Sequence, residues 1–207
     1  MANAKYELIE NDTVESWDGR KLFRIRALVA IAAMGVSAGD LGGYIEAEKN
    51  LQVSDNAWVS GNAQVYGDAW VYGNAQVYGN ARVYGNAQVY GNARVYGNAQ
   101  VYGNAQVSGD ARVSGDARVS GDARKTPVVI TGLRWNVTIT DYQMLIGCQI
   151  HEIAAWRDFD DRAILAMDGR IALEFWGQNK AALLAICDGT GRPFPKSDAL
   201  TTEAEAA

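Results

Sequence analysis

The stretch VYGDAW at residues 65–70, followed by VYGNAQ at residues 71–76, shows a six-residue unit that repeats without a break from Val53 to Arg124. Valine stands at every sixth position from 53 to 119, and alanine at every sixth position from 57 to 123, twelve times each. A period of six fits neither an α-helix nor a heptad, and it is typical of strand-and-corner units stacked into a β-solenoid. Such regular repetition leaves no room within the repeat for a unique catalytic residue.

Each unit has a simple physical interpretation. Along Ala-x-Val-Tyr the side chains alternate, so Ala and Val point to one side while the variable residue x and Tyr point to the other. The Gly-Asn or Gly-Asp pair that follows suits a corner where the backbone needs a positive φ. Three corners close a triangle, so residue n is expected to stack on residue n+18. The Val and Ala ladders then fill a narrow interior, where each buried Val contributes roughly 1.5–3 kcal/mol relative to exposure.

The units resemble the hexapeptide repeat of left-handed parallel β-helix proteins, written aliphatic-x-x-x-small-x. The resemblance covers residues 53–124, which corresponds to four triangular coils and about 20 Å along the axis at the usual strand spacing. It implies a mainly β fold and a left-handed coil, a hand that the spacing alone does not indicate. The second residue of each unit is Tyr or Ser here, whereas the family often has Gly or a small or acidic residue. That outward-pointing departure does not affect the fold prediction.

Charge, cysteine content and hydropathy argue against several classes of protein. The net charge of −5 divides into −2 for residues 1–52, 0 for residues 53–124 and −3 for residues 125–207. No segment is basic enough to predict a nucleic-acid interface. The two cysteines do not make a disulfide framework, and the N-terminus has no basic-then-apolar signal sequence. The apolar stretch 27–36 is about half the length needed to cross a bilayer. A cytoplasmic protein without a membrane segment is therefore expected.

The flanks of the repeat read differently. Residues 6–28 predict a β-hairpin with an Asp18-Gly19 turn, and residues 37–44 predict a loop. Ile45 and Leu51 fall in register with the Ala position of the repeat, and Ala47 with the Val position, so an irregular first coil is expected from Ile45. Residues 128–140 predict a last irregular coil or a small sheet. Helical periodicity starts at His151 and is clearest over 170–188, with an apolar face that includes Ala172, Phe175, Ala182, Leu183 and Ile186.

These patterns divide the chain into four segments. Residues 1–44 are expected to form an N-terminal hairpin cap, and residues 45–124 the β-helix. Residues 125–192 are expected to form a C-terminal β/helical cap or oligomerisation segment, and residues 193–207 a disordered tail. Because a solenoid exposes unpaired strand edges at both ends, the hairpin and the helices are interpreted as caps.

The sequence offers few candidates for chemistry. Acyltransferases are the best-known enzymes with this repeat, and they use a histidine and an inserted loop. The coils contain neither, since His151 is the only histidine. Cys148 with His151 can be read as a thiol beside a base, but a small buried cysteine before a helix is the favoured interpretation. The acidic run 158–161 with Asp168 can be read as a cation site, but a solvated helix start is favoured. We therefore predict no enzyme activity, no cofactor and no metal site.

The outer side chains form three similar faces when they are written at intervals of eighteen. Trp58 belongs to the first face, Gln64 to the second and Trp70 to the third, and tyrosines stand beside all of them. Such ladders can bind glycans, nucleobases or proteins. Like-on-like stacking that stabilises the coils is the favoured interpretation, because the three faces are alike.

The whole arrangement also resembles proteins of unassigned function that bacteriophages and prophages encode, through residues 20–60 and 128–190. The first hypothesis is a non-enzymatic scaffold or interaction protein, expected to be a homo-oligomer and, by the family resemblance, a trimer, in the cytoplasm of an infected bacterium. The second is an anti-defence protein that blocks a host protein or sequesters a small signalling molecule, and the third is an acyltransferase. Candidate contacts with a partner or ligand are Trp135, His151, Trp156, Arg157 and Arg162.

Overall fold

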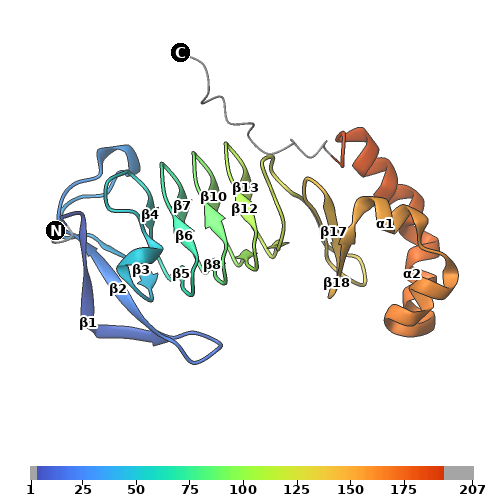
Figure 1. Cartoon of the computed structure of the whole chain (residues 1–207), viewed down its shortest axis with the longest axis horizontal. Coiled ribbons are helices and arrows are strands. Elements are labelled where there is room, and N and C mark those ends of the chain that lie inside the picture. Colours follow the sequence, from blue (N-terminus) through green and yellow to red (C-terminus); the bar gives the residue numbers. More distant parts are fainter. Residues whose placement is uncertain (1–3, 194–207) are drawn as a thin grey trace, which may run out of the picture. The chain divides into compact units, whose positions relative to one another are not determined.

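Eleven short strands, each formed by residue x and Val of one repeat unit, stack into three parallel sheets (Figure 1). Within each sheet a residue pairs with the residue eighteen positions later, as in Val59 with Val77 and Val77 with Val95. The predicted triangular coil is confirmed, while its hand stays a prediction. The strands are β4 (Trp58–Val59), β5 (Gln64–Val65), β6 (Trp70–Val71), β7 (Gln76–Val77), β8 (Arg82–Val83), β9 (Gln88–Val89), β10 (Arg94–Val95), β11 (Gln100–Val101), β12 (Gln106–Val107), β13 (Arg112–Val113) and β14 (Arg118–Val119).

The interior of the coils contains valine and alanine alone from Ala57 onward, and these side chains are at most 1% exposed. Val53 is an exception, because it is 36% exposed although it continues the spacing of the repeat. Ile45 pairs with Val65, and Leu51 with Val71, an interval of twenty residues. The predicted register, which placed Ile45 and Leu51 in the Ala position, was therefore wrong. Two extra residues lie between Leu51 and Ala57, and they carry Val53 out of the interior.

Three antiparallel strands precede the coils. β1 (Tyr6–Glu15) and β2 (Lys21–Ala27) form the predicted hairpin, and β2 pairs with β3 (Leu41–Ile45). The predicted loop at residues 37–44 was wrong at its second half, because Leu41–Tyr44 belong to β3, which also pairs in parallel with β5. Two short 3-10 helices connect these elements, η1 (Ala32–Met34) and η2 (Glu48–Asn50).

The glycines of β3 serve close packing. A Cβ on Gly42 would lie 2.3 Å from Ile25 Cγ1, and one on Gly43 would lie 2.7 Å from the carbonyl oxygen of Ala63. Both positions are buried, so the pair lets β3 lie directly against the first coil. A Gly-Gly pair that reads as a loop in the sequence is therefore a close approach of two backbones.

After the coils, a four-stranded sheet has the order β15-β16-β17-β18. Its strands are β15 (Val128–Ile130), β16 (Val137–Ile139), β17 (Gln143–Ile146) and β18 (Gln149–Glu152). Of the two predicted alternatives for residues 128–140, the small sheet is the one that forms. Ile139 and Met144 are fully buried in it.

The structure, a computed structural model, describes residues 4–193, so the tail predicted at 193–207 lies almost wholly outside the described residues. The chain divides into two units, Met1–His151 and Glu152–Ala207. The second contains α1 (Ile153–Asp158) and α2 (Asp161–Gly189), which is interrupted at Asp168 and Gly169. Beyond that interruption the predicted helix 170–188 is confirmed, except that Ala182 is exposed. Among the described residues, no helix is long and apolar enough to span a bilayer.

Replacement of Gly42 or Gly43 by alanine is expected to destabilise the first unit by about 1–3 kcal/mol, because the added methyl group has no space in a packed interior. Leu41→Ala is the matched control, since Leu41 lies in the same strand and is 56% exposed. Urea unfolding followed by circular dichroism measures the difference. Equal midpoints for Gly43→Ala and Leu41→Ala would contradict this account of β3.

Deletion of residues 77–94 removes eighteen residues and joins Gln76 to Val95, which occupies the same position in the next coil. The shortened protein is expected to stay folded and rich in β-structure, because every Val and Ala re-registers on an equivalent neighbour. Deletion of residues 77–91 is the control, since it leaves three unmatched residues, 92–94, between Gln76 and Val95. Circular dichroism and thermal unfolding compare the two, and equal loss of folded protein would argue against the triangular stacking.

Candidate ligand-binding cleft

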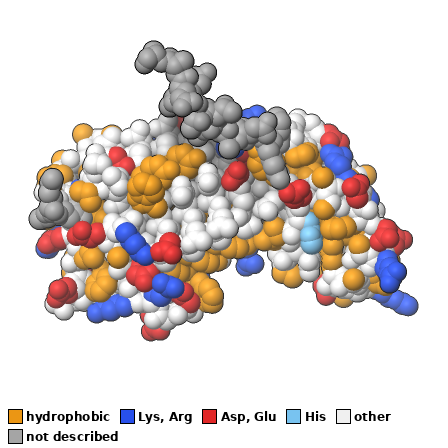
Figure 2. Space-filling view, in the orientation of Figure 1, with side chains coloured by type: hydrophobic (Ala, Val, Ile, Leu, Met, Phe, Trp, Pro, Cys, Tyr) orange, Lys and Arg blue, Asp and Glu red, His pale blue; other side chains and the backbone are white. Residues whose placement is uncertain are grey.

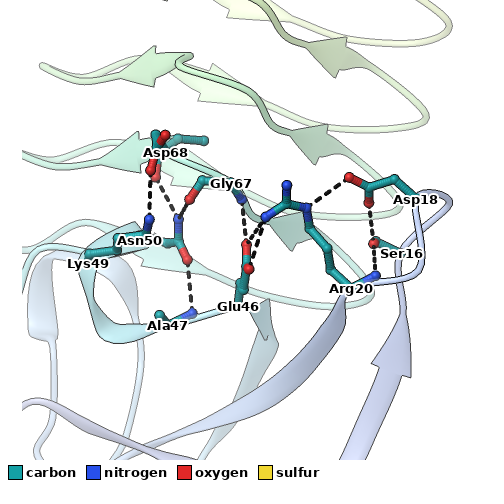
Figure 3. A network of polar contacts seen from close by, with 10 residues as sticks. Ser16, Asp18, Arg20, Glu46, Ala47, Lys49, Asn50, Gly67 and Asp68 are labelled. Atoms are coloured by element: carbon teal, nitrogen blue, oxygen red, sulfur yellow. Dashed lines mark hydrogen bonds and ion pairs between the residues drawn. The ribbon is translucent and has the colours of Figure 1, made fainter.

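The first coil is closed by groups that precede it in the chain. Glu46 accepts a hydrogen bond from Gly67 N–H at 2.7 Å, and Asn50 donates to the carbonyl oxygens of Gly67 and Ala69 (Figure 3). Arg20 pairs with Glu46 at 3.0 Å and with Asp18 at 2.8 Å. Hydrogen bonds from Ser16 and then Arg20 lower the pKa of Asp18. These contacts tie the hairpin to the coils, and they occupy the polar groups at this end.

The last coil is closed by groups that follow it. Backbone N–H groups of the three final arginine positions point away from the stack, and each donates to a side-chain oxygen. Arg112 donates to Thr126 at 3.3 Å, Arg118 to Thr138 at 3.4 Å and Arg124 to Asp141 at 3.0 Å. Thr138 and Asp141 are buried. This end is therefore also unavailable for adding a further strand.

The outward-facing tyrosine and asparagine side chains of each coil mostly contact the equivalent side chains of the next coil. Tyrosines at intervals of eighteen stack with ring centroids 4.8–5.4 Å apart, as in Tyr72 with Tyr90 and Tyr84 with Tyr102. The corner asparagines donate along the stack until Asn92 and Asn98 reach Asp110 and Asp116, which can only accept and so end the ladder. The ring faces between neighbouring tyrosines are covered by each other, so these faces are not open to sugars or bases. In the view of Figure 2, charged side chains gather over the hairpin and are sparse over the coils.

The three faces are not equivalent, contrary to the sequence prediction. The hairpin covers part of the second face, where Tyr66 is 1% exposed and Trp17 packs edge-on against Tyr84. Burial raises the pKa of Tyr66 to about 12. Tyr6 packs against Trp58 on the first face, which leaves Trp58 buried, whereas Trp70 on the third face is 37% exposed.

A cleft of about 610 Å³ lies where the last two coils of the second face meet the C-terminal sheet, and we refer to it as the C-terminal cleft. The coils contribute polar and charged side chains to its wall, and so does the segment that leads into β16. These residues are Asn98, Gln100, Asp116, Arg118, Arg134 and Asn136. The rest of the lining consists of Trp135, Thr138, Leu145, Gly147 and Cys148. Its volume is in the range that accommodates small molecules.

Two arginines and one carboxylate give the cleft a formal charge of +1 in a protein whose net charge is −5. The single carboxylate, Asp116, already accepts a hydrogen bond from Asn98 at 3.1 Å. The indole of Trp135 lies against Gly147, where an added Cβ would be 3.0 Å from Trp135 Cδ1. The guanidinium of Arg134 lies over the same indole, 5.6 Å from its centroid. The cleft thus combines cationic groups, amides and an aromatic ring.

Of the predicted contact residues, Trp135 lines the cleft and the other four do not. His151 lies on β18, where burial lowers its pKa. Trp156 is buried in the second unit and packs against Trp176 at 5.0 Å. Arg157 pairs with Asp188, and Arg162 is exposed on α2. The last three therefore belong to the helical unit, in which Trp156 and Arg157 stabilise the packing of α1 and α2.

The other sequence candidates have structural explanations. Cys148 is exposed in the turn between β17 and β18, so the prediction of a buried cysteine was wrong at this position. Asp160 accepts a hydrogen bond from Ala163 N–H at 2.8 Å and begins α2, which confirms the helix-start interpretation of the acidic run. Within residues 4–193, no cluster of His, Cys, Asp or Glu has the arrangement of a metal site.

Comparison with known proteins supports the repeat architecture. The coils are similar to the YdcK beta solenoid repeat. The model of that family matches residues 63–77, 75–87, 87–103 and 105–121, which is less than half of the chain. A search of curated proteins gives no match to this sequence. The comparisons therefore concern the coils, and they carry no information about the cleft.

Sequence reasoning missed Arg118, Arg134 and the amides of the cleft. Arg118 reads as one of several identical repeat positions, and only the sheet that follows distinguishes its face from the others. A usable signal was the Arg134-Trp135 pair directly after the end of the repeat, where a change of structure was expected.

The two cysteines are expected to differ in reactivity. Cys148 is exposed, whereas burial covers Cys187 completely and raises the pKa of its thiol, so that little thiolate forms. Under native conditions a maleimide should label Cys148 and spare Cys187, and both should react in guanidinium. Peptide mass spectrometry measures the sites, with Cys148→Ser as the control. Labelling of Cys187 at a comparable native rate would contradict the packing of the helical unit.

Proposed function

We propose that this protein is a non-enzymatic interaction protein, in which the β-solenoid is a rigid support and the C-terminal cleft is the binding site. The observation that supports this proposal is the contrast between the ladders and the cleft. Along the coils, tyrosine side chains stack on the equivalent tyrosines of the next coil, and asparagine side chains form hydrogen bonds with the equivalent asparagines. At the cleft, Arg118, Arg134 and Trp135 converge beside an open volume instead.

The capped ends of the coil stack favour a rigid support over a subunit that polymerises end to end. Backbone groups at both ends of the coil stack have partners in the flanking segments, so strand addition at either end would require displacement of those partners. We expect a homo-oligomer, and a trimer by the resemblance to hexapeptide proteins, to use the sides of the coils. Trp70 on the third face is 37% exposed and is a candidate for that contact. A bacteriophage origin and action in the host cytoplasm follow only from the resemblance, and they stay predictions.

Native mass spectrometry of freshly purified protein tests the proposal. The expected result is a mass above that of the 22.4 kDa chain or its oligomer, from a partner that dissociates on activation. The double variant Arg118→Gln/Arg134→Gln should lose the additional mass. Arg94→Gln is the matched control, because Arg94 is an exposed arginine of the first face and does not line the cleft.

The same measurement can contradict the proposal. Bare chains from the wild type that also bind no added small anion would argue against a binding role, and an additional mass that the double variant retains would place the binding site elsewhere. The oligomeric state is read from the same spectra. A monomer at all concentrations would contradict the expected homo-oligomer.

A further inference from the structure

We infer that the C-terminal cleft binds a small anion with a planar ring, of the nucleoside monophosphate type. The inference rests on the proposed function and adds the chemical class of the ligand. It depends on the placement of Arg118, Arg134 and Trp135 around one volume, with amide groups between them.

The anionic part of the ligand is specified by the two guanidinium groups. Arginine presents a planar set of N–H donors that matches phosphate or carboxylate oxygens in pairs. Arg118 and Arg134 come from two different segments, the last coil and the segment before β16. Among the described residues, neither arginine forms an ion pair that would compete with a ligand. With Asp116 included, the cleft keeps one net positive charge in an otherwise acidic protein.

The planar part of the ligand is specified by Trp135. Its indole rests on Gly147, whose φ of +59° and missing side chain permit the close approach. The guanidinium of Arg134 lies over the indole, 5.6 Å from its centroid, and we assign the ligand's ring to this side of Trp135. Arg134 is exposed, and exposed side chains exchange rotamers, so its guanidinium can move outward. A planar base can then stack on the indole in its place while the guanidinium pairs with the anion.

The remaining polar groups suit the part that joins ring and anion. Gln100 and Asn136 present both donors and acceptors, and Asp116 presents acceptors only. Sugar hydroxyls and exocyclic amines can satisfy such a mixed set, whereas a simple inorganic anion cannot. Asp116 at the same time disfavours ligands of high negative charge. The cleft volume of about 610 Å³ accommodates one mononucleotide.

Isothermal titration with three probes tests the inference. AMP carries both ring and phosphate, adenosine has only the ring, and ribose 5-phosphate has only the phosphate. AMP is expected to bind at least tenfold more tightly than either of the others. The double variant Arg118→Gln/Arg134→Gln should reduce AMP affinity to that of adenosine. Trp135→Leu should reduce it to that of ribose 5-phosphate, and Trp135→Phe should retain part of it.

Protection of Cys148 provides a second measurement at the site itself. AMP should slow maleimide labelling of Cys148 in the wild type and in Arg94→Gln, and it should not do so in the double variant. Circular dichroism and the sparing of Cys187 establish that each variant is folded.

Several results would overturn the inference. The inference is wrong if AMP binds no more tightly than adenosine or ribose 5-phosphate, or if its dissociation constant is above about 1 mM. It is also wrong if AMP leaves the rate of Cys148 labelling unchanged. An arginine-dependent mass in native spectra, together with any of these results, would retain the proposed function and assign the cleft to another kind of partner. Absence of that mass with clear AMP binding would identify AMP as a ligand that purification removes.

Discussion

The direction of the backbone hydrogen bonds between coils is the constraint on which the rest of the first unit depends. Residue x, Tyr and Asn of each unit donate N–H to a carbonyl oxygen seventeen residues later, as in Gln64 to Ala81 and Tyr84 to Val101. The stack is therefore polar, with acceptors left at its first coil and donors left at its last. An end with unpaired backbone groups is costly to bury and prone to aggregation when exposed.

The two caps are chemically opposite for this reason. The segment before the coils supplies donors, which include the backbone N–H groups of Tyr44 and Glu46 and the side-chain amide of Asn50. The segment after the coils supplies acceptors, the hydroxyl oxygens of Thr126 and Thr138 and the carboxylate of Asp141. The caps are consequently not interchangeable. The C-terminal cleft lies beside these cap contacts, since Thr138 belongs to its lining and accepts the hydrogen bond from Arg118.

The interior of the coils was predictable because it obeys one local rule, and the exceptions occur where tertiary contacts override that rule. The six-residue spacing alone placed Val59 on Val77, since alternation and corner geometry are short-range properties. The same spacing misplaced Val53, because two extra residues lie between Leu51 and Ala57. Asp55 in this segment forms an ion pair of 3.3 Å with Lys5, a contact between distant residues that no local pattern encodes. Gly42 and Gly43 were read as a loop because a glycine selected for close packing looks the same in sequence as one selected for a turn. The cleft was not predictable, because identical repeat arginines such as Arg94 and Arg118 differ only in what a distant sheet places beside them.

The coil geometry also controls how the cleft is positioned relative to the hairpin cap. Each insertion of eighteen residues translates the C-terminal sheet along the axis by about 4.8 Å without turning it. An insertion of six or twelve residues instead rotates it to another of the three faces. Because the cleft is built only from the last two coils and the sheet, gain or loss of units earlier in the chain leaves its chemistry unchanged. Gain or loss of repeat units would therefore change the distance of the cleft from the hairpin cap, and the side on which it lies, in discrete steps.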